Sequence, residues 1–356
     1  IPDDFPVRVM REDPEREGLL YAGTEFGLFV SFNDGDNWQS LQLNLPVTPV
    51  TGLQVAHGDL VLSTQGRSFW ILDDVTPLRE LSDSVAQSEM HLFSPRDATR
   101  ANTGARSGTD EDDEDEGGIT PDPPPGKALI HFHLAAVPED EVTLTILDRG
   151  GEVVRRFTSN EEKAKEENIG KMKLKAGLNR VVWDLTYPGP DKPEDVVLWG
   201  YGGGVKAPPG PYEVQLEALG QSQKRTMLVM RDPRLNSVMQ EDYEEQLALA
   251  LAIRDTMNEL YGSIRQVRSI REQLDTFAER AEGAGYGEEI QTAVNELKDK
   301  LTSVEEVMVQ TKNQSGQDPI RFAPRLENQF VALYEYVTGP DEYRSGGPEG
   351  KPTAGA

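Results

Sequence analysis

Two histidines are the residues of this chain whose type and spacing most resemble a metal site. His131 and His133 are two positions apart in an apolar segment, so on a strand they share one face and could bind a metal ion together. The sequence shows no evident third ligand. The alternative interpretation is a pair of strand residues that faces solvent or a seam between domains, and we therefore expect no metal site.

The acidic residues raise the question of sugar hydrolysis. Glycosidases use two carboxylates that flank one sugar, about 5 to 10 Å apart. Glu25, Asp73 and Asp74 lie in segments with the composition of turns, where solvated side chains are the simpler interpretation. Among 62 Asp and Glu residues some such pair arises by chance. A sialidase also needs three arginines and a tyrosine nucleophile, and only Arg67 is well placed, so we expect no catalytic residue and no cofactor.

One turn carries the residue types of a binding surface. Residues 64–68 are followed by Trp70, and arginine and tryptophan are frequent anchors in binding sites. We take Glu25, Gln65, Arg67 and Trp70 as the candidate ligand-binding residues, for a protein or a glycan. The alternative is a solvated turn without a ligand.

Composition excludes several classes of function. The 356 residues carry a formal net charge of −26, which disfavours nucleic acid and anionic lipid as partners because both require basic surfaces. The absence of cysteine excludes thiolate catalysis, disulfides and cysteine-based zinc sites. No stretch approaches the roughly 18 consecutive apolar residues of a membrane span, so we expect no membrane insertion.

The elements that position these residues begin with short strands in residues 1–100. Four apolar runs broken by turns occupy residues 7–41, a length typical of one propeller blade, and a shorter unit follows at residues 50–72. We interpret residues 1–100 as terminal β-propeller blades with an exit strand. Two blades cannot close a ring, and open sheet edges invite pairing. We therefore expect further blades upstream on the same precursor or on another chain.

Three more regions follow the blades. Residues 101–126 are acidic and rich in proline, as in a linker. Residues 127–235 contain six or seven short strands, which predicts an immunoglobulin-like β-sandwich. Residues 236–340 carry apolar side chains every three or four positions, with a break at residues 283–285, which predicts an antiparallel three-helix bundle. Residues 341–356 resemble a flexible tail.

The segment Ser31-Phe-Asn-Asp-Gly-Asp-Asn-Trp38 resembles the Asp box of sialidases, sortilin-type receptors and other BNR-repeat propellers. That motif runs Ser-x-Asp-x-Gly-x-x-Trp, and Asn33 stands here in place of its Asp. The resemblance implies a structural role for Ser31, Asn33, Gly35 and Trp38, away from any ligand.

Residues 144–155, 177–185 and 209–214 resemble the sandwich strands of large exported bacterial proteins of this kind, which are often labelled glycosyl hydrolases. The likeness covers nearly the whole chain, but only the second half of such a protein.

These features together favour a non-catalytic binding or scaffold portion of an exported, sortilin-like BNR-repeat protein. Its location would be the periplasm, the cell surface or the extracellular space. One alternative is an accessory part of a glycoside hydrolase whose active site lies in upstream blades. Another is a subunit of a hetero-oligomeric envelope assembly, which the exposed blade edge at residues 7–10 suggests.

Overall fold

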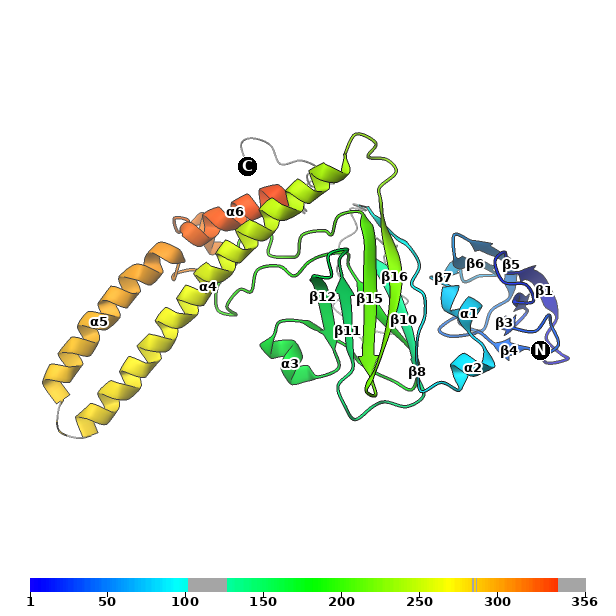
Figure 1. The fold of residues 1–356 in the computed structure, drawn as a ribbon, viewed down its shortest axis with the longest axis horizontal. Coiled ribbons are helices and arrows are strands. Elements are labelled where there is room, and N and C mark those ends of the chain that lie inside the picture. The colour runs from blue at the N-terminus through cyan, green and yellow to red at the C-terminus, as the bar shows by residue number, and fades with distance from the viewer. Residues whose placement is uncertain (102–126, 284, 286, 339–356) are drawn as a thin grey trace.

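The computed structural model describes residues 1–101, 127–283, 285 and 287–338. Two small sheets lie at one end of an elongated molecule, two further sheets lie in the middle, and helices extend to the other end (Figure 1). The chain is thus a mixed β and α protein with a helical C-terminal region. The predicted linker, apart from residue 101, and the predicted tail lie outside the described residues. Within these residues no helix has both the length and the apolar character needed to cross a membrane.

Seven short strands form the N-terminal pair of sheets, close to the positions that the sequence predicts. One sheet has the order β1-β2-β3-β4 and the other the order β5-β6-β7, with antiparallel neighbours throughout. The turn between β3 and β4 uses positive φ angles at Asp34 (56°) and Gly35 (91°), which Asp tolerates and Gly adopts freely. The strands are β1 (Val7–Glu12), β2 (Leu20–Thr24), β3 (Gly27–Ser31), β4 (Gln39–Ser40), β5 (Val50–Ala56), β6 (Asp59–Thr64) and β7 (Phe69–Leu72).

The two N-terminal sheets bury one shared core, which we call the blade core. Its fully buried side chains come from both sheets and include Tyr21, Leu28, Val30, Val50, Leu53, Leu60 and Leu62. A Cβ atom at Gly23 would lie 2.7 Å from Cγ1 of Val50 and 2.8 Å from Cγ1 of Val9. The close approach of β2 to β5 therefore requires glycine at this position.

Two short helices, α1 (Thr76–Glu80) and α2 (Asp83–Ala86), lead out of the blade core. Arg16 donates from its guanidinium to the carbonyl oxygens of Leu78 and Leu81, which the end of α1 leaves without helical partners. Arg79 forms a 3.0 Å ion pair with Asp13, whose side chain is fully buried. These contacts hold the exit segment against the first sheet.

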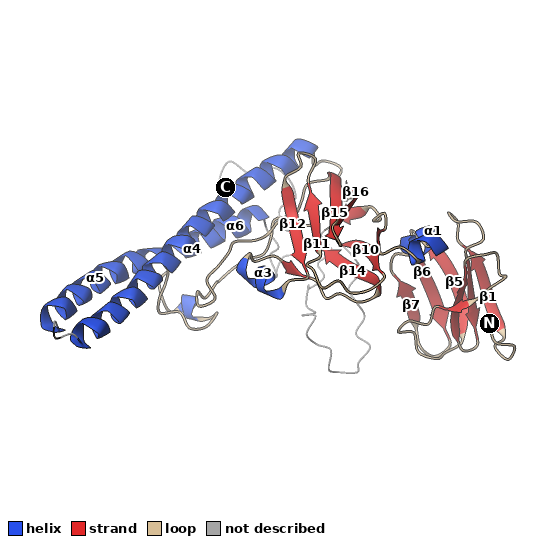
Figure 2. Cartoon of the chain, turned by 60° about the horizontal axis from the view of Figure 1, so that its bottom comes forward, coloured by secondary structure: helices blue, strands red, loops and turns tan. Residues whose placement is uncertain are grey.

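The middle of the molecule consists of two sheets that face each other (Figure 2). One has the order β14-β10-β8 and the other the order β13-β12-β11-β15-β16-β9. The indole nitrogen of the fully buried Trp183 donates to the carbonyl oxygen of Thr186. The one hydrogen-bond donor of this large buried side chain therefore has a partner. The strands are β8 (Met90–Leu92), β9 (Ala98–Arg100), β10 (Ala128–Leu134), β11 (Thr143–Leu147), β12 (Val153–Thr158), β13 (Gly170–Lys171), β14 (Gly177–Trp183), β15 (Gly210–Ala218) and β16 (Gln221–Arg231).

The short strands β8 and β9 belong to the middle sheets. Residues 90–100 were predicted to belong with the N-terminal strands, but β8 pairs with β10 and β9 pairs in parallel with β16. Three-residue strands carry too little alternation to be assigned from sequence. Between β12 and β13, the charged insertion forms helix α3 (Glu161–Glu166), whose N-terminal amides are capped by the Asn160 side chain.

The long connection between β14 and β15 rests on the helices. Its glycine-rich composition suggests an unattached loop, but Tyr201 stacks on Tyr334 with ring centroids 6.1 Å apart. The Tyr334 hydroxyl donates to the carbonyl oxygen of Gly203 at 2.9 Å. Through this connection, side chains of the middle sheets and of the helices form one continuous hydrophobic core. We call it the central core.

The helices are arranged as two layers. They are α4 (Gln240–Gly283), α5 (Gly287–Met308) and α6 (Leu326–Thr338), with a single 3₁₀ turn at Asp318–Ile320. α6 packs on the N-terminal half of α4, where Gln246 donates to the carbonyl oxygen of Val337. α5 packs on the C-terminal half, where Lys298 pairs with Asp275.

This arrangement differs from the expected antiparallel three-helix bundle. The segment between α5 and α6 contains Pro319 and Pro324, which interrupt the helix without reversing it. α6 therefore continues in the direction of α5, and each covers a different part of α4 (Figure 1).

A buried carboxylate holds α5 against α4. Glu305, with 4% of its side chain exposed, accepts 2.7 Å hydrogen bonds from Arg268 and Arg271 of α4. Burial alone would raise the pKa of Glu305, but the two arginines outweigh burial and lower that pKa below its ordinary value. Arg268 also pairs with Asp195 of the long connection, so this cluster joins three segments.

The substitution Glu305→Gln should loosen the contact between α4 and α5. It keeps the side-chain shape but removes the anion that two partly buried arginines share, a change that costs about 3 kcal/mol in comparable pairs. We expect amides of α5 to exchange with solvent about 100-fold faster at neutral pH, measured by hydrogen exchange. Because the pKa of Glu305 is lowered, its contribution is present above the ordinary glutamate range and is lost as the pH falls through the folded value.

The control is Glu306→Gln, which removes the same charge from an exposed neighbouring position and should change stability by no more than about 0.5 kcal/mol. Equal exchange rates in the two variants would show that the cluster does not hold α5.

A second buried carboxylate, Glu327, has a raised pKa, whereas the pKa of Glu305 is lowered. Glu327 on α6 is 1% exposed and accepts hydrogen bonds from the Tyr261 hydroxyl at 3.3 Å and from Asn328 at 2.7 Å. Burial raises the pKa of Glu327, and the hydrogen bond from Tyr261 and the charge of Lys192 offset only part of this effect. A charged Glu327 therefore costs stability at neutral pH.

We expect Glu327→Gln to stabilise the helical region at pH 7 by about 1 kcal/mol, which corresponds to about 2–4 °C in melting temperature. A glutamine can accept from Asn328 and donate to the Tyr261 hydroxyl without a charge. The raised pKa means that wild-type stability is lost as pH rises through the folded value. The gain should therefore vanish in acid, where Glu327 is protonated. Calorimetry at several pH values tests this, and a gain that grows in acid would contradict it.

Candidate functional site

The four candidate ligand-binding residues lie in two separate turns. Glu25, between β2 and β3, pairs with Arg8 at 2.5 Å. Gln65, Arg67 and Trp70 lie at the turn between β6 and β7, where the Trp70 indole donates to the carbonyl oxygen of Arg67 at 2.9 Å. In the described part of the chain, no hydrogen bond or ion pair joins Glu25 to the other three. The two turns therefore form no single polar site, and a ligand role for them stays a prediction.

The Asp-box residues bond to their own turn. The Ser31 hydroxyl accepts from the amide of Gly35 at 2.9 Å and contacts the side-chain oxygen of Asn33 at 3.1 Å. That oxygen also accepts from the amide of Asn37 at 2.9 Å. The Trp38 ring lies against Gly35. Asn33 thus supplies the acceptor that an Asp would supply at this position, and the polar side chains of the segment bond within their own turn.

The first sheet has an apolar outer face. Since Met10, Ala22 and Phe29 are in register across β1, β2 and β3, their side chains share the face opposite to the blade core. Phe5 extends this surface and packs on Phe26 and Phe29, with centroids 4.6 and 6.0 Å away. We call Phe5, Val7, Met10, Leu20, Phe26 and Phe29 the outer blade face.

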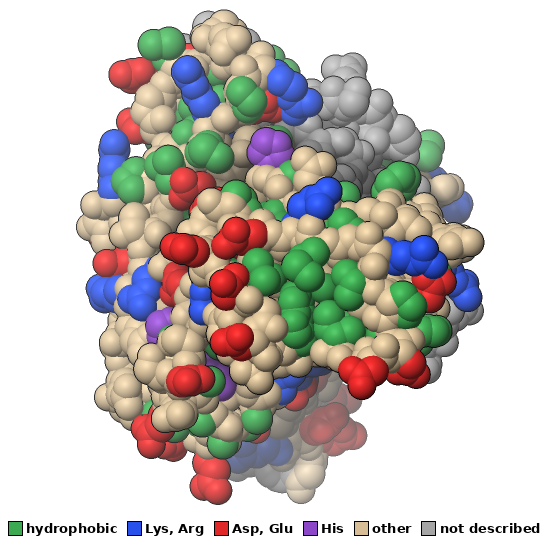
Figure 3. All heavy atoms as spheres, turned by 90° about the vertical axis from the view of Figure 1, so that its right-hand side faces the viewer, with side chains coloured by type: hydrophobic (Ala, Val, Ile, Leu, Met, Phe, Trp, Pro, Cys, Tyr) green, Lys and Arg blue, Asp and Glu red, His purple; other side chains and the backbone are tan. Residues whose placement is uncertain are grey.

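The outer blade face is exposed to solvent. Val7, Met10 and Phe26 are 46%, 45% and 41% exposed. Figure 3 looks at this end of the molecule and shows hydrophobic side chains gathered in one patch with acidic side chains beside it. A contiguous exposed apolar patch is typical of a surface that contacts another molecule. This face was not predicted, because a ligand was expected at turns; the alternation of residues in β1–β3 was the available signal.

A second feature is the seam between the exit segment and the middle sheets. His91 and His133 are directly opposite each other on β8 and β10, so with His131 they share one face of that sheet. Two carboxylates from the exit segment face them: Glu80 lies 3.4 Å from Nε2 of His91, and Asp74 lies 3.4 Å from Nδ1 of His131. These five residues form what we call the histidine seam.

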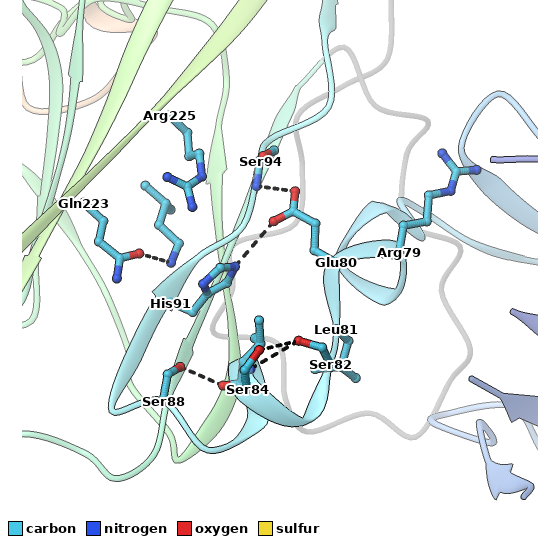
Figure 4. A network of polar contacts seen from close by, with 12 residues as sticks. Arg79, Glu80, Leu81, Ser82, Ser84, Ser88, His91, Ser94, Gln223 and Arg225 are labelled. Atoms are coloured by element: carbon cyan, nitrogen blue, oxygen red, sulfur yellow. Dashed lines mark hydrogen bonds and ion pairs between the residues drawn. The ribbon is translucent and has the colours of Figure 1, made fainter. Parts of the chain in front are cut away.

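Figure 4 shows how the seam is tied together. Glu80 also accepts a 3.0 Å hydrogen bond from the amide of Ser94, and Gln223 of β16 bonds the amide of Leu92 and the carbonyl oxygen of Met90. The fourth histidine of the chain, His57, lies beside the same junction, where its carbonyl oxygen accepts from Arg96. The two-residue spacing of His131 and His133 predicts a shared face, directed either to solvent or to a seam between domains. In the structure this face lies toward the exit segment, where Asp74 approaches His131.

The seam does not converge on a metal centre. His91 and His131 face separate carboxylates, and the buried Nε2 of His133 has no hydrogen-bond partner. Among the residues that the structure describes, no group of three or more His, Asp or Glu is arranged to hold a metal ion. The seam supports a polar contact between the exit segment of the N-terminal sheets and the middle sheets.

Comparisons with known proteins give little guidance. No protein-family model and no curated protein matches the sequence. PorZ, described as an essential bacterial surface component of the type-IX secretion system of Porphyromonas gingivalis, is 14% identical over 63% of this chain, with a TM-score of 0.17. A Salmonella alpha-2-macroglobulin reacted with methylamine is 15% identical over 63% of this chain, with a TM-score of 0.20. The chain covers 30% of PorZ and 12% of the macroglobulin, and the low TM-scores establish no shared fold.

Asp74 is the seam residue whose contribution can be tested by charge removal. Its buried carboxylate accepts from the Thr76 amide and hydroxyl and faces His131. Burial alone would raise the pKa of Asp74, but the contacts with His131 and Thr76 lower it. Asp74 thus contributes stability above its ordinary titration range, and that contribution is lost as the pH falls through the folded value.

We expect Asp74→Asn to loosen the seam, because it keeps a residue that tolerates the positive φ of 63° and removes the charge that faces His131. Loss of a buried partner costs about 1–3 kcal/mol, so the Phe93 amide, which bonds to His131, should exchange about 10- to 100-fold faster at pH 7. Hydrogen exchange measures this, with exposed Glu89→Gln as the control. Unchanged exchange in Asp74→Asn would contradict the role.

Proposed function

We propose that this chain is a non-catalytic docking and scaffold portion of an exported, sortilin-like propeller protein. Its two N-terminal sheets would be terminal blades, its middle sheets an immunoglobulin-like sandwich, and its helices a brace. The observation that carries the proposal is the outer blade face. Its apolar side chains resemble those that pack between successive blades, and Val7, Met10 and Phe26 remain more than 40% exposed in the described part of the chain.

The proposed occupant of the outer blade face is a further blade, upstream on the same precursor or on another chain. One observation supports a sheet as the occupant. The face belongs to a four-stranded sheet, and Phe5, Phe26 and Phe29 cluster on it as an apolar surface that a second sheet can cover.

An exported location forms part of the same proposal. It rests on the Asp-box resemblance and on the cysteine-free composition. Recognition of a protein or glycan would then belong to the assembled ring, with the turns that carry Glu25, Gln65, Arg67 and Trp70 as candidate contacts.

The test is native mass spectrometry of the protein from its source, followed by denaturing mass analysis. We expect the chain to be continuous with, or bound to, a polypeptide that carries additional Asp boxes. In the bound case, Met10→Arg should weaken the complex about tenfold or more, because it places a charge in an apolar contact. Val47→Arg is the matched control, since Val47 is 74% exposed outside the outer blade face. A chain that travels alone at its own mass would overturn the proposal.

A further inference from the structure

A small cavity lies where three segments meet: the turn between β11 and β12, the connection from β14 into β15, and the start of α4. Its volume is about 130 Å³. Sites for drug-sized molecules take about 300 to 1,000 Å³, so this cavity accommodates only the end of a side chain or a small ligand group. We call it the tyrosine cavity, and its lining includes Asp148, Tyr187, Pro208, Tyr212, Glu244 and Leu247.

The walls of the tyrosine cavity are parts of the central core. Tyr187 and Tyr212 are 8% and 5% exposed and belong to that core, and Leu247 of α4 packs against it. The Tyr212 hydroxyl donates to the carbonyl oxygen of Pro208 at 2.7 Å, which fixes the position of this side chain. The cavity is therefore preformed, so binding does not bear the entropic cost of ordering its walls.

The Tyr187 hydroxyl is the unusual polar group of these walls. Tyr187 lines the cavity, yet its hydroxyl has no hydrogen-bond partner among the residues that the structure describes. Burial and the charge of Asp148 raise the pKa of Tyr187 to about 12, so the hydroxyl keeps its proton at neutral pH. Most buried polar groups in proteins have a hydrogen-bond partner. A buried tyrosine of this kind indicates that the cavity takes a polar group.

The charge of the lining favours a cation over an anion. Glu244 pairs with Arg149 at 3.0 Å, which offsets its charge. Asp148 accepts hydrogen bonds from the amides of Gly150 and Glu152 through Oδ1, but within the described ranges its carboxylate has no ion pair.

A further cation, Arg254, acts electrostatically on Tyr187, but this arginine is paired with Asp255. The carboxylate of Asp148 is thus the charge of the cavity that lacks a counter-ion. The chain as a whole, with its net charge of −26, also attracts cationic ligands.

An ammonium group matches these features better than other cations. It carries three hydrogen-bond donors on a compact head and no acceptor, so it can donate to Asp148 and to the Tyr187 oxygen together. A guanidinium is a planar fork that requires parallel acceptors, and the cavity offers one free carboxylate. Proteins that recognise ammonium groups also use tyrosine in the walls of their sites, because aromatic rings attract cations.

We propose that the tyrosine cavity binds the ammonium end of an alkylamine, the group that ends a lysine side chain. Asp148 supplies the counter-charge, Tyr187 accepts a hydrogen bond, and the methylene groups next to the ammonium contact Leu247 and Pro208. The same group can come from a lysine of a partner protein or from a free alkylamine. This site lies away from the outer blade face, so the proposal is independent of the role suggested for the N-terminal sheets.

The experiment is an NMR titration of the whole chain with lysine that is acetylated at its α-amino group and methylamidated at its carboxyl group. The amides of Gly150 and Glu152 bond to Asp148, so their chemical shifts report on the cavity directly. We expect them to shift with a Kd of about 1 mM, as for a contact of a few atoms. The equally blocked norleucine, which keeps the stem and lacks the ammonium, should bind at least about tenfold more weakly.

Two variants test the assigned groups. Asp148→Asn keeps the acceptor of the Gly150 and Glu152 amides and removes the charge, whereas Tyr187→Phe removes only the hydroxyl. Each should weaken binding of the blocked lysine about tenfold, because each removes a hydrogen-bond partner of a charged group. Glu152→Gln is the matched control, since it removes a charge from an exposed position of the same turn and should change the Kd by less than about twofold.

The possible outcomes separate the proposal from its alternatives. Absence of a shift at about 50 mM blocked lysine would overturn it and leave the cavity to water. Equal binding of the norleucine analogue would overturn the choice of an ammonium group. Binding that neither Asp148→Asn nor Tyr187→Phe weakens would place the lysine elsewhere on the acidic surface, which also overturns the proposal.

A last comparison identifies the source of the ammonium group. If the blocked lysine binds at least about fivefold more tightly than n-butylamine, its backbone amides contribute and the ligand belongs to a protein. If the two bind equally, the cavity recognises the amine alone and a free alkylamine is the ligand. Either result supports the site, because both require binding through the ammonium.

Discussion

The packing of the long β14–β15 connection against α4 and α6 is the interaction on which the rest of this structure depends. Tyr201 and Tyr334 stack there, and the Tyr334 hydroxyl donates to the backbone carbonyl of Gly203. This packing makes the middle sheets and the helices one hydrophobic unit, because the central core runs through both. α4 can then extend about 65 Å with a fixed direction, at the rise of an α-helix. The C-terminal half of α4 and the helix α5 project from the molecule for that reason (Figure 1).

The two junctions of the chain differ in chemistry. The central core joins sheets to helices through apolar contact, whereas the blade core is a separate cluster that meets the middle sheets across the histidine seam. Polar pairs such as Glu80 with His91 depend on geometry and on ionic conditions, while buried apolar area depends on neither to the same degree. The N-terminal sheets are therefore attached by polar contacts whose strength depends on salt and pH. The helices are attached by apolar contacts whose strength depends much less on either.

Much of the secondary structure could be predicted from the sequence, and the elements that were not predicted have physical causes. The short strands of residues 7–41 and 50–72 and the helices with long apolar periods were predicted close to their observed bounds, as in the end of α4 at Gly283. The three-residue strands β8 and β9 were missed because they exist only through pairing with distant partners. The expected three-helix bundle was wrong, because periodicity reports which face is buried and not which part of a long helix a partner covers. The seam was half predicted: His131 and His133 were singled out, but His91, Asp74 and Glu80 meet them only through tertiary contact.

The separation of the two cores also has a mechanical consequence. A pulling force applied between the ends of the molecule acts on the histidine seam and the central core in series. The seam can part by breaking a few polar contacts in turn, whereas parting the helices from the middle sheets exposes Tyr334 and its apolar neighbours together. The seam therefore yields first and spares both folded units. Under such a force the N-terminal sheets would separate from the middle sheets with their own core intact, before either hydrophobic core unfolds.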